Sequence, residues 1–260
     1  MAVTRFPLAK DVINQAASEL GLGQVGDPFQ APDPKWAQLI SLLSKVGQKL
    51  ALGYAWSQLR TEWVFNTQAG DTGIYLIPAD FIDMVDQTGW NRTSRLPLGG
   101  PLSAQEWQYV QAWAMGLTIT VLFRQNATEL WLYPQPPPAG VKIAMEYRSS
   151  SWVAPAASVG ACTANNYKTL GPVNGSDTPA AAGDLLLFDK LLLVAKLKAA
   201  FLSEKGMDTT KADEEADDLY EKCTARQANG QVLSLNGPRL GIPGARLIGN
   251  ANLPPTGYGQ

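Results

Sequence analysis

Apolar residues recur at helical spacing in the first quarter of the chain. Those within residues 8–20 follow one face of a helix, and Gly21 is a natural stop for it. Asp33 and Pro34 then supply an N-cap and a proline at the first helical position, which predicts the start of a second helix. Its apolar stripe continues over residues 34–59, although two internal glycines weaken it.

Two further helices are predicted toward the other end of the chain. Residues 184–205 are apolar nearly all round, which is typical of a central, buried helix. Residues 209–227 combine a thin apolar face with a dense acidic one. The acidic side chains of this last helix are Asp213, Glu214, Glu215, Asp217, Asp218 and Glu221.

The middle of the chain carries strand and turn patterns. Residues 62–67 and 73–77 predict short strands, and residues 81–85 predict a short turn or helix. Ser103 and Glu106 have the spacing of a capping box, which predicts the start of another helix.

Apolar and polar residues alternate in three segments, at 117–124, 129–133 and 141–148. Because turns separate these segments, we predict a three-stranded antiparallel meander with one solvent-exposed face.

Two segments lack a regular pattern. Residues 156–183 are mostly small or polar, which predicts a long loop. Residues 229–260 contain seven glycines, four prolines, two arginines and no acidic residue, yet apolar residues recur in them. We interpret residues 229–260 as an extended arm that packs on another subunit or partner; disorder and packing within the chain are the alternatives. The arm residues expected to make contacts are Val232, Leu235, Arg239, Leu240, Ile242, Arg246, Leu247 and Ile248.

These elements together predict an α+β fold. Helices from both ends of the chain form a bundle, a small antiparallel β-domain is inserted between them, and an arm extends from the C-terminal end. The expected division is 1–60 for the N-terminal helices, 61–155 for the β-domain with one helix, 156–183 for the long loop, 184–228 for the C-terminal helices and 229–260 for the arm.

Composition restricts the possible chemistry. The chain has 260 residues, with 21 basic and 23 acidic side chains and no histidine. Lack of histidine excludes Ser-His-Asp and Cys-His nucleophiles and His-ligated metals. Cys162 and Cys223 alone cannot form a structural zinc site, so we expect two free or buried thiols. No apolar run has the length of a signal peptide or a membrane helix, so we expect a soluble, non-secreted chain that contacts no membrane.

Several motifs occur outside their usual setting. Residues 21–26 satisfy G-x-G-x-x-G but follow a helix, so we interpret them as a helix-terminating loop. Asp80, Asp83 and Asp86 are spaced three apart and could hold Mg²⁺ or Ca²⁺ on a helix, although a solvated helix face is the simpler interpretation. We predict no catalytic residue, no metal ligand and no cofactor; a carboxylate pair for glycoside hydrolysis is the remaining enzymatic alternative.

Aromatic residues allow two further interpretations. Trp90, Arg92 and Arg95 mix aromatic and basic side chains, and because the surrounding charge is low we interpret them as interface or core anchors rather than a nucleic-acid surface. The alternative function is a carbohydrate- or ligand-binding module, whose stacking platform on the meander would consist of Trp131, Tyr133 and Trp152.

Four short runs carry a family resemblance. They are YLIPADF at 75–81, WNRT at 90–93, PLSAQEW at 101–107 and EYRSSSW at 146–152. In this order, and with helical segments on both sides, they resemble the head-to-tail adaptor (connector) proteins of tailed bacteriophages, including the tail tubular A group of short-tailed phages. The resemblance spans most of residues 8–228.

The resemblance implies a structural virion protein and no enzyme. Such proteins form a ring, usually dodecameric, at the head–tail junction of a particle assembled in the host cytoplasm. The ring lies below the portal protein, extends the DNA channel and supports the tail nozzle or tube, while genomic DNA passes without sequence-specific binding. An acidic lumen would not attract DNA, because like charge removes the counterion-release attraction. We therefore predict that the channel-lining residues are Asp213, Glu214, Asp217, Asp218 and Glu221. The arm would hold the portal or a neighbouring subunit.

Overall fold

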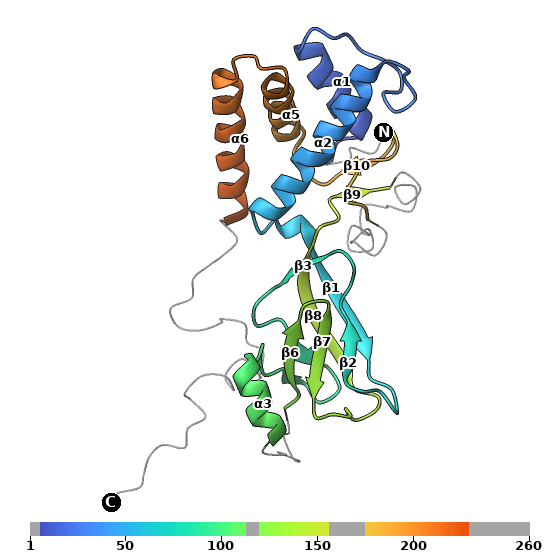
Figure 1. Ribbon diagram of the computed structural model, residues 1–260, viewed down its shortest axis with the longest axis vertical. Coiled ribbons are helices and arrows are strands. Elements are labelled where there is room, and N and C mark those ends of the chain that lie inside the picture. Colours follow the sequence, from blue (N-terminus) through green and yellow to red (C-terminus); the bar gives the residue numbers. More distant parts are fainter. Residues whose placement is uncertain (1–5, 113–119, 156–174, 229–260) are drawn as a thin grey trace, which may run out of the picture. The chain divides into compact units, whose positions relative to one another are not determined.

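The computed structural model describes residues 6–112, 120–155 and 175–228, which form an α+β fold (Figure 1). The helices are α1 (Ala9–Glu19), α2 (Pro34–Gly53), the 3-10 turn η1 (Ser57–Leu59), α3 (Ala104–Ala112), α5 (Lys190–Glu204) and α6 (Thr210–Ala228). The strands are β1 (Arg60–Asn66), β2 (Ile74–Leu76), β3 (Phe81–Met84), β4 (Trp90–Asn91), β5 (Leu96–Pro97), β6 (Leu122–Asn126), β7 (Glu129–Tyr133), β8 (Lys142–Ser149), β9 (Val153–Ala154) and β10 (Leu185–Leu186). The predicted α+β class is confirmed. The predicted arm and most of the predicted loop lie outside the described residues.

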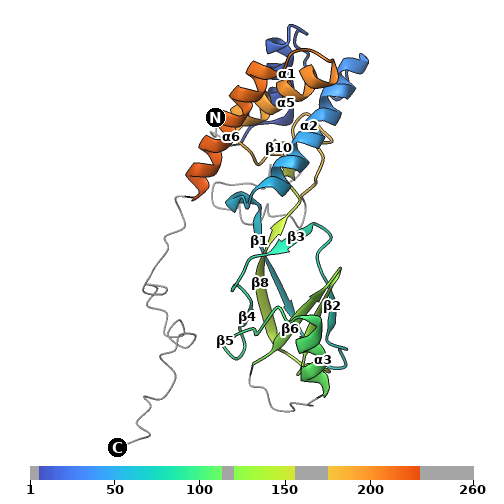
Figure 2. The ribbon, with the colours of Figure 1, turned by 60° about the vertical axis from the view of Figure 1, so that its left-hand side comes forward.

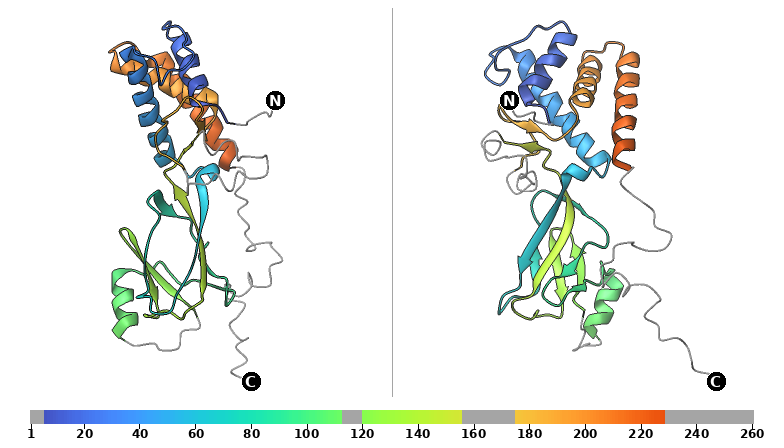
Figure 3. Two further views of the ribbon diagram at one scale, coloured as in Figure 1. Left: turned by 90° about the vertical axis from the view of Figure 1, so that its right-hand side faces the viewer. Right: turned by 180° about the vertical axis from the view of Figure 1, so that it is seen from behind.

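Helices from the two ends of the chain share one hydrophobic core. α5 packs against both α1 and α2, and Figure 3 shows this arrangement from two sides. Leu192 and Leu193 of α5 are fully buried with Ile13 of α1 and Leu39 of α2 in this core. Burying one such side chain contributes about 1.5–3 kcal/mol of transfer free energy. The helical bundle predicted from the two apolar patterns is therefore confirmed.

α2 ends earlier than the apolar stripe predicts. Its last residue is Gly53 rather than a residue near 59, since Tyr54 already has extended backbone angles. Trp56 folds back beneath the helix, and its indole N–H donates a 2.7 Å hydrogen bond to the Leu50 carbonyl oxygen. This contact satisfies a carbonyl group at the open end of the helix, and the remaining residues form η1.

α5 begins later than its apolar pattern predicts, at Lys190 rather than residue 184. The preceding leucines form β10, which pairs with β9, and Leu186 N–H also donates to the Pro7 carbonyl oxygen at 2.9 Å. Asp189 then caps the helix, because its carboxylate accepts the Leu191 N–H at 2.9 Å. The apolar run predicted as one helix therefore forms two elements, the short buried strand β10 and the helix α5.

The central strands form two antiparallel sheets. One has the order β1-β8-β4-β5, with β3 also paired to β8, and the other has the order β2-β7-β6. Residues 99–102 join them at one side, since Gly99 and Leu102 both form backbone hydrogen bonds with β6 (Figure 2). Among the described residues, β1 and β3 each pair with β8 alone and β2 pairs with β7 alone, so these three strands each have one edge without a partner strand. The core between the sheets contains Val121, Phe123, Leu130, Leu132, Ile143 and Met145.

The predicted three-stranded meander is wrong at its third strand. β6 and β7 form the expected hairpin, but β8 pairs with β1, β3 and β4. The run Pro134–Pro138 follows β7, and prolines cannot continue a hydrogen-bonded ladder. β8 therefore enters the other sheet, where Ala144 is only 2% exposed on the face expected to be solvated.

The predicted turn or helix at residues 81–85 is also wrong, because this segment contains the strand β3. Its residues pair with the C-terminal end of β8, and the ring of Phe81 stacks on that of Tyr147 with centroids 5.5 Å apart. A neighbouring strand thus outweighs a weak local preference.

α3 covers part of the outer face of the β2-β7-β6 sheet. The predicted capping box starts it: the Ser103 hydroxyl accepts the Glu106 N–H, and the Glu106 carboxylate accepts the Ser103 N–H at 2.7 Å. Hydrogen bonding to the carboxylate from the Ser103 backbone N–H, and next from the Ser103 side chain, lowers the pKa of the Glu106 carboxyl. Trp107 and Val110 then pack against Tyr133 of β7, as their helical spacing predicts.

Candidate functional site

The acidic helix α6 is held by two lysines of α5. Lys196 Nζ lies 2.6 Å from a carboxylate oxygen of Asp217, and Lys198 Nζ lies 3.0 Å from one of Glu215. Between these ion pairs, Ala216 is fully buried on the apolar side of α6. Two of the six acidic residues therefore bind the helix to its own chain.

The environment of Lys198 keeps this attachment charged. Its hydrogen bond to Glu215 raises the pKa of the ammonium group, and Glu19 of α1 adds a second ion pair at 3.4 Å. A raised lysine pKa stabilises the fold fully below the unfolded-state pKa, and this contribution disappears only as the pH rises through the higher folded-state value. Attachment of α6 should therefore not change across the neutral pH range.

The other acidic residues lie away from α5. Helical periodicity places Glu214, Asp218 and Glu221 on the side of α6 opposite its buried alanines. Asp218 forms an ion pair with Lys222 at 2.5 Å, whereas Asp213, Glu214 and Glu221 have no ion pair within the described part of the chain. Of the five predicted channel-lining residues, three thus remain exposed and unneutralised.

The C-terminal end of α6 is fixed beside η1. The Gln227 side chain accepts a 2.5 Å hydrogen bond from the Ser57 hydroxyl and donates one of 2.9 Å to Gln58. One turn earlier along α6, the hydroxyl of Tyr54 donates to the Thr224 carbonyl oxygen at 3.3 Å. These contacts anchor the helix at the last residues before 229–260.

Neutralising the unpaired acidic residues should leave the fold intact. For the triple variant Asp213→Asn, Glu214→Gln and Glu221→Gln we expect an unchanged melting temperature, because these side chains have no ion pair to lose. Its matched control, Glu215→Gln with Asp217→Asn, removes both contacts to α5 and should destabilise slightly, since an exposed ion pair contributes about 0.2–1 kcal/mol. Thermal denaturation followed by circular dichroism measures both. A large decrease in the melting temperature of the triple variant would instead show that its carboxylates stabilise the fold of their own chain.

The predicted interface anchors lie in the hairpin of β4 and β5 in the β1-β8-β4-β5 sheet. Trp90 lies in β4, paired with Ala144 of β8, and is partly buried. Arg92 forms an ion pair with Glu62 of β1, and Arg95 is exposed in the turn between β4 and β5 with a φ of 59°. The structure brings the three residues into one hairpin; their role as anchors stays a prediction.

The three aspartates considered for a cation do not gather at one point. The carboxylate of Asp80 accepts hydrogen bonds from the hydroxyl of Tyr147, and Asp83 forms an ion pair with Arg148 at 2.6 Å. Asp86 follows the end of β3. Because the segment is a strand rather than a helix, its spacing of three does not place them on one side. No cluster of three or more candidate metal ligands occurs among the described residues.

The proposed aromatic platform is not supported. Trp152 is fully buried in the helical core, where its ring stacks on Phe188, and Tyr133 is 8% exposed in the cluster beneath α3. Trp131 is half-buried and packs against Trp107. Since Trp152 belongs to the helical core whereas Tyr133 and Trp131 belong to the cluster beneath α3, the three residues offer no common surface to a sugar ring.

The glycine-rich segment after α1 terminates the helix, as predicted. Gly21 has a φ of +72°, and Leu22 N–H donates to the Ala17 carbonyl oxygen at 2.8 Å, which is a helix-ending arrangement. The Asn14 side chain forms two hydrogen bonds with the backbone of Val25 and so holds the loop in place.

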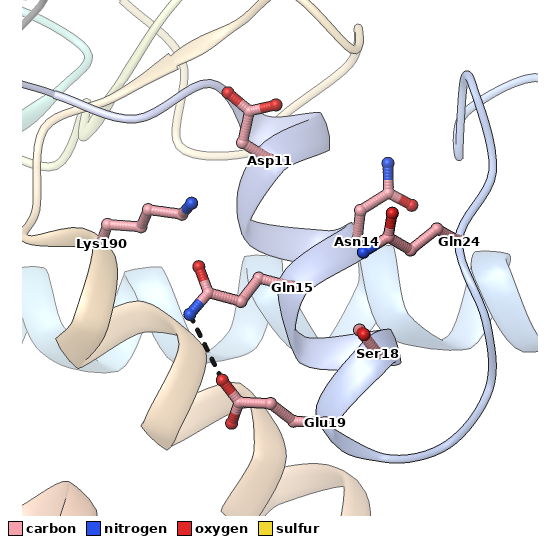
Figure 4. A pocket seen from close by; sticks show the side chains of 7 residues that line it. All are labelled: Asp11, Asn14, Gln15, Ser18, Glu19, Gln24 and Lys190. Carbon is pink, nitrogen blue, oxygen red and sulfur yellow. Dashed lines mark hydrogen bonds between the residues drawn. The ribbon is translucent and has the colours of Figure 1, made fainter.

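An open depression of about 390 Å³ lies on the outer side of α1 (Figure 4). Its one hydroxyl belongs to Ser18, and Figure 4 marks no hydrogen bond from that hydroxyl to a lining lysine or carboxylate that could act as its base. The residues that line it are Asp11, Asn14, Gln15, Ser18, Glu19, Gln24 and Lys190.

Sequence reasoning missed the exposed apolar edge of β2. Ile74 is 42% exposed and Leu76 is 78% exposed. A signal was available, because residues 74–77 read Ile-Tyr-Leu-Ile and so place apolar side chains on both faces of the strand.

Comparisons with known proteins agree with a role in assembly. A family model described as SU10 adaptor protein matches residues 8–236. No curated protein matches the chain. None of the helices within the described ranges has the length and apolar character needed to cross a membrane.

Proposed function

Because the chain belongs to the SU10 adaptor protein family, we propose that it forms a ring below the portal protein at the head–tail junction of a phage particle. The family consists of structural phage adaptors and is not an enzyme family. It agrees with the resemblance to head-to-tail adaptors, while the narrower likeness to the tail tubular A group stays a prediction. The match over residues 8–236 is the observation that carries this proposal.

The proposed ring is dodecameric, extends the DNA channel and supports the tail nozzle or tube. Asp213, Glu214 and Glu221 are the best candidates for its lumen, because they are exposed and form no ion pair among the described residues. Like charge would let DNA slide past this surface without binding. Residues 229–260 would hold the portal or a neighbouring subunit, and the particle would assemble in the host cytoplasm.

Purified portal rings test this function directly. The full-length chain should co-sediment with them, and electron microscopy should show an added ring on the axis of the portal. Failure to bind portal rings, together with its absence from purified particles, would contradict the proposal.

Charge reversal tests the lumen separately. Rings that carry Asp213→Lys, Glu214→Lys and Glu221→Lys should retain DNA at low salt and release it as the salt concentration rises. Rings that carry Asp11→Lys on α1 provide a control, because the lumen assignment does not include that helix. If both variants retained DNA equally, the assignment of α6 to the channel lumen would be wrong.

A further inference from the structure

The free edge of β2 exposes apolar side chains and backbone groups at the same place. Among the described residues this strand pairs with β7 alone. The Gly73 carbonyl oxygen and the Ile77 N–H bond to β7, so alternation directs the backbone polar groups of Ile74 and Leu76 away from it. Leu76, at 78%, is also the most exposed large apolar side chain in the described residues.

This edge strand is short, which is itself a common protection, but it carries neither a charged residue nor a bulge to oppose pairing with another chain. Natural sheets guard free edges with charged residues, proline or bulges. Of the other strands that pair on one side only, β1 carries Arg60 and Glu62 and β3 carries Asp83, whereas the three residues of β2 are all uncharged. An exposed, apolar and uncharged edge is typical of a site that receives an added strand.

Residues 229–260 contain a segment that fits such an edge. Pro238 and Pro243 cannot donate to a ladder, so they limit one pairable run to residues 239–242, about the length of β2. Leu240 and Ile242 are two residues apart in this run, so an added strand would place them on one face, as β2 places Ile74 and Leu76.

Charge also favours this occupant. Residues 229–260 contain arginines and no acidic residue. Beside β2, Glu129 of β7 lies directly across from Leu76, and Asp71 precedes the strand. A segment of only positive charge therefore approaches an edge flanked by carboxylates.

We propose that residues 239–242 of a neighbouring copy add as a strand to the free edge of β2. The inference rests on the proposed ring, in which every copy would donate one segment and receive another. Such a head-to-tail contact closes on itself when the rotation between copies completes a circle. It gives residues 229–260 a defined receiving surface on the next subunit.

Disulfide trapping tests which copy supplies the strand. In a background with Cys162→Ala and Cys223→Ala, the pair Leu76→Cys and Ile242→Cys is oxidised in rings assembled on portal. We expect a ladder of covalent multimers on non-reducing gels. The control pair, Met207→Cys with Ile242→Cys, uses an equally apolar, exposed residue of the α5–α6 loop and should stay monomeric. Assembled rings without multimers, or only internally linked monomers, would overturn the proposal.

A charge placed on the edge tests the same contact without cysteines. Leu76→Lys should reduce the yield of rings at least roughly tenfold, since lysine on an edge strand opposes pairing. Its melting temperature should not change, because the side chain is exposed. Met207→Lys is the control and should assemble normally. Normal ring yield for Leu76→Lys would overturn the proposal, whereas failure of the unsubstituted chain to bind portal would instead contradict the proposed function.

Discussion

Replacing Gly47 with alanine is expected to destabilise the chain by about 3 kcal/mol, the upper part of the usual range for overpacking a core. A methyl group at this position of α2 would overlap the six-membered ring of Trp152. That ring cannot easily move, because it is fully buried and its indole N–H donates a 2.7 Å hydrogen bond to the Asp177 carbonyl oxygen. Thermal denaturation should show the loss as a fall of roughly 10 °C for a chain of this size.

The same substitution at Gly53 is the matched control. A methyl group there would lie 3.4 Å from the Tyr220 hydroxyl, which is ordinary contact. Alanine is favoured over glycine in helices by up to about 1 kcal/mol, so Gly53→Ala should be neutral or slightly stabilising. Adding Trp152→Leu to Gly47→Ala should recover part of the loss, because the smaller side chain leaves room for the methyl group. If Gly47→Ala alone had the melting temperature of the unsubstituted chain, the packing described for α2 would be contradicted.

Deleting residues 229–260 is expected to abolish attachment to portal rings while the helical core stays folded. The core cluster shared by α1, α2 and α5 ends at Phe201, and the side chains of α6 that pack on it end at Cys223. The deletion therefore retains every side chain of this core within the described residues. Circular dichroism should show the helical content and its cooperative melting retained, and co-sedimentation with portal rings should show binding lost.

A shorter deletion tests whether attachment depends on the predicted contact residues of this segment or only on the length of the segment. Removing only residues 250–260 leaves every predicted contact residue up to Ile248, so attachment should persist. If the chain that lacks all of 229–260 still joins portal rings, the predicted role of the arm is wrong. If the shorter deletion also abolishes attachment, the contacts lie in the last eleven residues rather than in the predicted ones.

The acidic surface shows how far composition predicts a candidate site. The cluster on α6 was visible in the sequence, because six carboxylates fall within residues 213–221. Which of them stay unpaired depends on Lys196 and Lys198 of α5, whose positions beside α6 follow from packing of the two helices. The apolar run at residues 74–77 was also visible in the sequence, but that one edge of β2 stays free depends on which strands pair with it.

Local chemistry in the sequence determined where most elements form. Asp33 with Pro34, and Ser103 with Glu106, start helices at the predicted positions, and apolar periodicity identified the buried faces of α1, α2 and β6. These features depend on residues within a few positions of one another, so a sequence displays them directly.

Only the tertiary structure decided which elements meet. Alternation in β8 predicts which of its faces is buried but not which strands it pairs with. Because the proline run after β7 cannot continue a hydrogen-bonded ladder, β8 pairs with β1, β3 and β4 instead of β7. Gly47 looks like a weak point of a helix, yet it provides the space for Trp152, which is distant in the sequence. Periodicity records which face of an element is buried, whereas the choice of partner follows from side-chain shapes that fit only after distant segments have packed.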